Sequence, residues 1–174
     1  MHLASTRIID DAYYGELKIC LSAERGVVEV SGEQIPTVII ERSSDAVLNK
    51  FVPIGTREAA HLTVSVDGIE DDLRLGPGKL TRGSYRVELT FAGAHYKFMP
   101  DSADATQLWR DGAKIASFSL DDADGTFVVH WQTGRDDSQP ADAALGYALS
   151  AAFRTGATGI FSLLLNGSEN VPWH

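Results

Sequence analysis

The sequence predicts a mainly β protein: a single antiparallel barrel, or closed sheet, of about twelve strands around one late hydrophobic α-helix. Three observations predict this fold. Short segments rich in Val, Ile, Thr, Phe and Tyr alternate apolar and polar residues, Asp-Gly pairs separate several of them, and the period changes only near the end of the chain. The 174 residues, 44% of them hydrophobic, suit one domain. We expect that domain to span residues 1–166, followed by a tail at 167–174.

Nine segments show the clearest strand pattern, and weaker candidates bring the total to about a dozen. The nine segments are 16–22, 27–30, 35–41, 61–66, 85–91, 95–99, 106–110, 113–120 and 126–132. Asp-Gly pairs occur at Asp67-Gly68, Asp111-Gly112 and Asp124-Gly125. Such pairs supply the positive φ angles of a two-residue type I′ turn. Consecutive strands are therefore expected to pair antiparallel.

The best-defined hairpin has "TQLWR" and "AKIASFSL" on either side of Asp111-Gly112. Alternation places Leu108 and Arg110 on one face of the sheet and Trp109 on the other. A valine at Gly112 should therefore be costly. The segment "GPGKLTRG" at 76–83 lacks the residues of a phosphate-binding loop, since positions 73 and 80 are both leucine. We expect a loose connection there, in which Gly78→Ala costs little.

One helix is expected at about residues 141–155. Pro140 suits its first turn, Asp142 complements its positive end, and Gly156 suits its close. No charged residue lies between Asp142 and Arg154, so the helix is apolar on every side and Leu149 should be fully buried. A length of roughly 22 Å is too short for a bilayer core of about 30 Å. Surrounding sheet is the expected environment.

Composition limits the partners. The net charge of −9 argues against nucleic acid and against strong binding to anionic membranes, because both need a positive surface. A protein partner or a small ligand stays open, as does the oligomeric state. Cys20 is the only cysteine and is predicted to be a buried, inert thiol. The N-terminal residues lack the pattern of a secretory signal, which favours the cytoplasm.

No template for catalysis, metal binding or a cofactor fits the sequence. The segment 120–127 lacks the first Asp and the last Glu of a calcium loop, and the histidines at 2, 61, 95, 130 and 174 have no metal-site spacing. No Gly-x-Ser-x-Gly motif is present. Aromatic and histidine side chains in strands either line a ligand pocket or pack within the sheet. The candidates for a ligand pocket are Trp109, Trp131, Tyr96, His95 and His130.

The strand number, the late helix and the stretch "YKFMPDSADATQLWRDGAKIASFSL" together resemble the tubby C-terminal-like superfamily, over about residues 25–155. This superfamily includes tubby, LURP-one-related proteins and phospholipid scramblases. The resemblance implies a barrel around a central helix. Members that bind phosphoinositides use basic clusters, and Lys79, Arg82 and Arg86 match no such motif. The apolar run at 160–165 also departs from the superfamily pattern.

Three functions follow as hypotheses. The first is a non-enzymatic binding or interaction module of tubby-like type. The second is an acidic assembly or adaptor subunit that docks through its tail at 167–174, where a tryptophan precedes the last residue. The third is an enzyme with Glu88 or Asp122 beside His95 or His130 in the barrel mouth. Since every catalytic template fails, the binding module is preferred.

Overall fold

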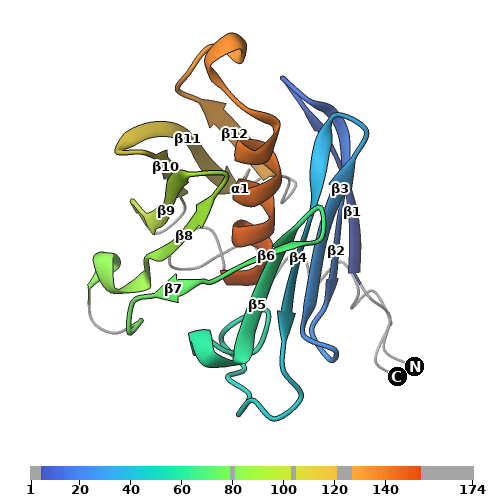
Figure 1. Ribbon diagram of the computed structural model, residues 1–174, viewed down its shortest axis with the longest axis vertical. Helices are drawn as coiled ribbons and strands as arrows, with labels where there is room; N and C mark the ends of the chain where they lie inside the picture. The colour runs from blue at the N-terminus through green and yellow to red at the C-terminus, as the bar shows by residue number, and fades with distance from the viewer. Residues whose placement is uncertain (1–4, 79–80, 103–104, 121–126, 154–174) are drawn as a thin grey trace, which may run out of the picture.

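The computed structural model describes residues 5–78, 81–102, 105–120 and 127–153. Within these ranges, twelve strands form two six-stranded antiparallel sheets, and one helix, α1, lies between them (Figure 1). The first sheet contains β1 (Ser5–Asp11), β2 (Gly15–Ser22), β3 (Val27–Gly32), β4 (Ile35–Arg42), β5 (Leu62–Val66) and β6 (Ile69–Asp71). The second contains β7 (Arg74–Leu75), β8 (Val87–Phe91), β9 (Ala94–Pro100), β10 (Ala105–Arg110), β11 (Ala113–Leu120) and β12 (Phe127–Trp131).

The prediction of a mainly β protein with about twelve strands is confirmed, but the single closed sheet is not, because neither sheet closes on itself among the described residues. Each sheet is an open meander in sequence order, with β1 and β6 at the edges of the first and β7 and β12 at the edges of the second. The chain leaves one sheet for the other at Asp72 and Leu73. Period-two patterning identifies the buried face of a strand and does not identify its neighbours. The sequence pattern therefore did not predict that the strands divide into two sheets after β6.

The strand assignments agree with the alternation of the sequence. All nine predicted segments contain a strand, and β1, β6 and β7 were missing from the clear set. His61 and Tyr85, predicted as strand ends, instead lie in the single 3₁₀ turns Ala59–His61 and Arg82–Tyr85. The last predicted segment begins at residue 126, which lies outside the described residues. β6 and β7, with three and two residues, are too short for a period to appear, a reason that does not apply to the seven residues of β1.

Three of the two-residue hairpin turns have the predicted backbone geometry. Both residues of each turn have positive φ, as type I′ turns require. The three turns are Asp67-Gly68 (47° and 83°), Ala92-Gly93 (51° and 79°) and Asp111-Gly112 (50° and 80°). The first and third confirm the Asp-Gly predictions, whereas Asp124-Gly125 lies outside the described residues. The Ala92-Gly93 turn was not predicted, because alanine is not a typical residue at positive φ.

The expectation that the loop around Gly78 is loose is wrong. Gly78 has a φ of 66°, and a β-carbon at this position would lie 2.9 Å from Nε of Arg57. Substitution here would therefore meet both backbone strain and a close neighbour. Gly134 has neither restriction, since its φ is −64° and nothing lies within 4 Å of an added β-carbon. It is the better position for a control.

Helix α1 (Pro140–Phe153) is buried on every side, as predicted: all thirteen residues after Pro140 are buried, and Leu149 is 1% exposed. It contacts β2, β3 and β4 on one side and β10 and β11 on the other. The predicted final residues of the helix lie outside the described ranges. Among the described residues, no helix is both long and apolar enough to cross a membrane.

The prediction of a buried cysteine is wrong. Cys20 is half-buried and lies on the outer face of β2, with its sulfur 3.6 Å from Oγ1 of Thr6. The alternation of β2 explains this position, because Ile19 and Leu21 on either side of Cys20 are buried. The thiol belongs to the outer row of the first sheet.

Candidate binding surface

Outward-facing side chains of the second sheet form a continuous row across five strands. Residues directly opposite each other in an antiparallel pair have side chains on the same face. From β7 to β11, the row consists of Arg74, Glu88, Lys97, Trp109 and Lys114. Glu88, Lys97 and Trp109 each have a buried sequence neighbour, namely Val87, Phe98 and Leu108. Because neighbouring residues of a strand point to opposite faces, the row faces away from the core. The predicted orientation of Trp109, opposite to Leu108, agrees with this register.

Trp109 lies between two lysines in this row. Lys97 is opposite it on β9, and Lys114 is opposite it on β11. Nζ of Lys97 lies 5.6 Å from the Trp109 ring centroid, a distance at which a cation is attracted to the ring. Within the described part of the chain, neither lysine forms an ion pair. Two positive charges therefore flank an aromatic ring, and Glu88, opposite Lys97 on β8, forms its ion pairs with Arg86 and His95 instead.

Glu88 is the only carboxylate that strands β7 to β11 contain. Its Oε2 atom lies 3.4 Å from Nε of Arg86, and its Oε1 atom lies 3.1 Å from Nε2 of His95. Because Glu88 already pairs with Arg86 and His95, the charges of Arg74, Lys97 and Lys114 make the rest of the row positive. We call this surface the basic face and define it as Arg74, Arg86, Glu88, His95, Lys97, Trp109 and Lys114. The basic face thus contains four arginine or lysine side chains and one carboxylate, that of Glu88.

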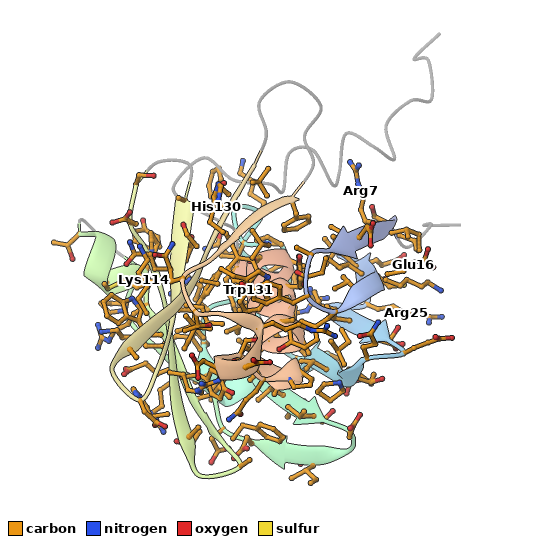
Figure 2. All side chains as sticks on the ribbon, turned by 90° about the horizontal axis from the view of Figure 1, so that it is seen from above. Arg7, Glu16, Arg25, Lys114, His130 and Trp131 are labelled. Atoms are coloured by element: carbon orange, nitrogen blue, oxygen red, sulfur yellow. The ribbon has the colours of Figure 1, made fainter. Side chains whose placement is uncertain are left out.

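The five predicted pocket residues do not share one surface. Trp109 and His95 belong to the basic face, and His130 is exposed on β12, opposite the outward-facing Ser117. Tyr96 is 1% exposed and faces the core. Trp131 also faces inward: Figure 2 shows it over α1 between the sheets, with Lys114 and His130 on the side of the second sheet. Its ring stacks on Tyr13 at 5.1 Å between centroids.

Asp142, which is fully buried, joins α1 to the second sheet. Its carboxylate accepts hydrogen bonds from Nη1 of Arg110, from the Tyr96 hydroxyl at 2.8 Å and from the Gln139 backbone N–H at 2.8 Å. The last bond caps the start of the helix. Burial raises the pKa of Tyr96 and the charge of Asp142 adds to it. Burial alone would lower the pKa of Arg110, but its bonds with Asp142 raise it overall.

Asp11 joins α1 to the first sheet. The Tyr147 hydroxyl donates to Oδ2 of Asp11 at 2.7 Å, while Oδ1 accepts the backbone N–H groups of Tyr13 and Tyr14. Burial raises the pKa of Tyr147, and the charge of Asp11 raises it further. Both oxygens of this carboxylate are therefore occupied, as are those of Asp142. The two buried acids stabilise the position of the helix and have no oxygen left for a ligand.

The structure does bring together one of the carboxylate and histidine pairs considered for catalysis. Glu88 and His95 are hydrogen bonded, although Asp122, the other predicted acid, lies outside the described residues. The side chains of Glu88 and His95 are 24% and 45% exposed, on an open sheet face. Water reaches both groups, and catalytic acids and bases are more effective in a site that excludes it. The pair is better placed to bind than to catalyse.

A further exposed feature is the loop between β4 and β5. Val47, Leu48 and Phe51 are 84%, 64% and 66% exposed, which is unusual for three large apolar side chains so close in sequence. Hydrogen bonds order the loop, including Asn49 N–H to the Gly55 carbonyl at 2.7 Å. These exposed apolar side chains were not predicted from the sequence.

Comparison with known proteins identifies no relative: no family model, curated protein or solved structure matches the chain. The protein can therefore be classified only by its fold and by the basic face. It is a protein of two open six-stranded sheets around one buried helix, with a basic outer face on the second sheet.

Proposed function

We propose that the protein is a non-enzymatic binding module that recognises an acidic surface of a protein partner through the basic face. The observation that supports this most directly is Trp109 between Lys97 and Lys114, two lysines without ion pairs among the described residues, in a chain of net charge −9. Tryptophan and arginine are enriched among the residues that dominate binding energy at protein interfaces, and the basic face contains Trp109 together with Arg74 and Arg86.

A protein surface suits this face better than an extended polyanion. Nucleic acid and anionic membranes present negative charge over a wide area. Because the chain has a net charge of −9, its surface beyond the basic face would repel both. A local acidic patch meets the lysines without that opposition. The resemblance to tubby-like proteins, some of which bind phosphoinositides, stays a prediction, and the proposal does not depend on it.

Fluorescence anisotropy with a fluorescein-labelled peptide of about ten glutamates tests the proposal. Lys97→Glu/Lys114→Glu should weaken binding at least about tenfold, since charge reversal replaces attraction by repulsion. The matched control is Lys18→Glu/Arg25→Glu, which changes the net charge equally on the side of the first sheet; Figure 2 shows Arg25 opposite Lys114. Equal affinities for the two double variants would overturn the proposal, because binding would then not involve the basic face.

The other two functions remain predictions. Docking through residues 167–174 concerns residues outside the described ranges, and deletion of those residues with loss of a captured partner would support it. The enzyme hypothesis depends on the pair formed by Glu88 and His95, whose side chains are 3.1 Å apart. Glu88→Gln keeps the shape of this pair and removes its charge, so unchanged turnover of any substrate found would contradict it.

A further inference from the structure

The outer face of the first sheet has the opposite charge to the basic face. Leu17, Val28 and Ile40 face the core, so the residues directly before and after each of them along its strand face outward. Outward positions of β1 to β6 contain one cation, Lys18, and five carboxylates. The carboxylates are Asp10, Glu16, Glu29, Glu41 and Glu70. We call this set, with the neighbouring outward residues of these strands, the acidic face.

The two charged faces point away from each other. Helix α1 lies between the sheets in Figure 1, and Figure 2 shows Glu16 and Lys114 on opposite sides of the molecule. Since α1 and both inner sheet faces separate them, the carboxylates of one face do not neutralise the lysines of the other within one chain. Each face therefore has its excess charge available for another molecule.

Resting on the proposed function, we infer that the acidic surface recognised by the basic face is the acidic face of a second copy of this chain. The two faces are complementary in charge, and both are outer surfaces of six-stranded antiparallel sheets. Sheets pack face to face at about 10 Å with strand directions within about 30°. Because the two contacting faces differ, the contact is heterologous and leaves one free face at each end, so stacking continues beyond a dimer.

Apolar side chains are present on both faces beside the charges. Trp109 is half-buried on the basic face, and half-buried Ile39 lies opposite Glu29 on the acidic face. Ile8, opposite Lys18, is 60% exposed. Burial of such groups stabilises an interface whose specificity comes from charge. A pocket of about 430 Å³ lies where β2 begins and β3 ends, lined by Glu16, Lys18 and Glu33, among others.

The net charge of −9 predicts an unusual salt dependence for this contact. Two copies repel each other at long range, and salt at about 0.15 M screens charges more than about 8 Å apart. Lysine and carboxylate groups that meet in the interface are closer together and are screened less. Association should therefore be strongest at intermediate ionic strength. It should weaken both at very low salt, where repulsion dominates, and at about 1 M, where the contacts are screened.

Sedimentation velocity over a range of protein concentrations tests this inference with two charge-reversal variants. Lys97→Glu/Lys114→Glu makes both faces acidic, and Glu29→Lys/Glu41→Lys replaces two carboxylates of the acidic face by lysines, so that neither face has an excess of negative charge. Each variant alone should associate at least about tenfold more weakly than the wild type, and an equal mixture of the two should regain association. Glu16→Lys/Glu70→Lys, at two exposed positions, replaces the second variant if that one does not fold.

Specific results would overturn the inference. A wild type that stays monomeric at all salt concentrations rejects the second copy, while the proposed function survives if the glutamate peptide still binds through Lys97 and Lys114. Self-association that neither variant changes would place the interface elsewhere, such as the loop at Val47, Leu48 and Phe51. A single-stranded oligonucleotide that binds a monomeric chain through Lys97 and Lys114 would reject both the second copy and the protein partner.

Discussion

The first and second sheets have the same meander topology and strand number, but their side chains differ on both faces. Toward the helix, the first sheet presents aliphatic residues such as Ile19, Val30 and Ile40, whereas the second presents the rings of Phe98 and Phe118, which contact each other edge to face at 6.0 Å. Toward solvent, the first is acidic and the second basic. The alternation of the strands thus determines the architecture, and the outward residues determine the charge of each outer face.

The helix is attached to the two sheets by different chemistry. An ion pair, Asp142 with Arg110, reaches the second sheet, while an uncharged donor, Tyr147, reaches Asp11 of the first. A buried ion pair is costly to break, because the remaining charge is left without a partner. The attachment to the second sheet is therefore the stricter requirement on side-chain identity.

The largest effect should come from a charge on the helix itself. Leu149→Asp should prevent soluble folding, because burying an unpaired carboxylate costs several kcal/mol or more against a total stability of about 5–15 kcal/mol. Leu149 is 1% exposed, whereas Val47→Asp, at a position 84% exposed, provides a control that should fold normally. Circular dichroism and thermal unfolding of the soluble fractions measure both. A soluble Leu149→Asp variant with cooperative unfolding would show that the helix is not enclosed.

The close approach of the helix to the second sheet can be tested at Gly146. A β-carbon there would lie 2.1 Å from Cζ of Phe118, so Gly146→Ala should destabilise by about 1–3 kcal/mol through overpacking. Without that contact, the same change in a helix would stabilise by about 1 kcal/mol. Urea unfolding decides the sign. In a Phe118→Leu background the cost should fall, and an unchanged cost would mean that another contact is responsible.

Much of this comparison could be predicted from the sequence, and the missing parts have specific causes. Alternation and Asp111-Gly112 predict the hairpin, and its two-residue turn already places Trp109 opposite Lys114. The pairing of Glu88 with Lys97 depends on the Ala92-Gly93 turn. This turn was not predicted, because alanine is not a typical residue at positive φ. Without that register, the basic face could not be assembled.

The buried attachments were also beyond the sequence. Asp142 was predicted only to complement the start of the helix, and its partner Arg110 is 32 residues away on a strand. Asp11 and Tyr147 are 136 residues apart. Such pairs depend on how the two sheets enclose the helix. The alternation and turn residues of the sequence do not show how the helix sits between the sheets. The inward direction of Arg110 was predictable, and the group it meets was not.

Equivalent turns in the two sheets should differ in their sensitivity to valine. Gly112→Val should destabilise by about 1–3 kcal/mol, because valine resists the φ of 80° found there. Gly68→Val, at a φ of 83° in the first sheet, should cost less, because β6 is a three-residue edge strand that can detach. Gly134→Ala is the neutral control. Equal midpoints of chemical unfolding for both valine variants would show that β6 is as firmly held as β11.

The smallest expected effect concerns alkaline pH and compares the two attachments through their tyrosines. Burial is the main cause that raises the pKa of Tyr96 and of Tyr147, and each is raised further by its hydrogen-bonded aspartate. In the unfolded chain both ionise near pH 10. Above that pH the unfolded state loses protons that the folded state keeps, so stability is complete below about pH 10 and falls as pH rises. Each tyrosine contributes up to about 1.4 kcal/mol per pH unit to this loss.

Tyr147→Phe and Tyr96→Phe should each cost about 1 kcal/mol at pH 7, the net value of one hydrogen bond, and each should make the alkaline loss shallower. Urea unfolding at pH values from 7 to about 11 gives both quantities for the wild type and the two variants. Asp142 keeps Arg110 and the Gln139 N–H when Tyr96 is replaced, and Asp11 keeps two backbone N–H groups when Tyr147 is replaced. Similar costs at pH 7 are therefore expected. If the alkaline slope of either variant equals that of the wild type, the replaced hydroxyl ionises in the folded protein, and the helix is not sealed from water on that side.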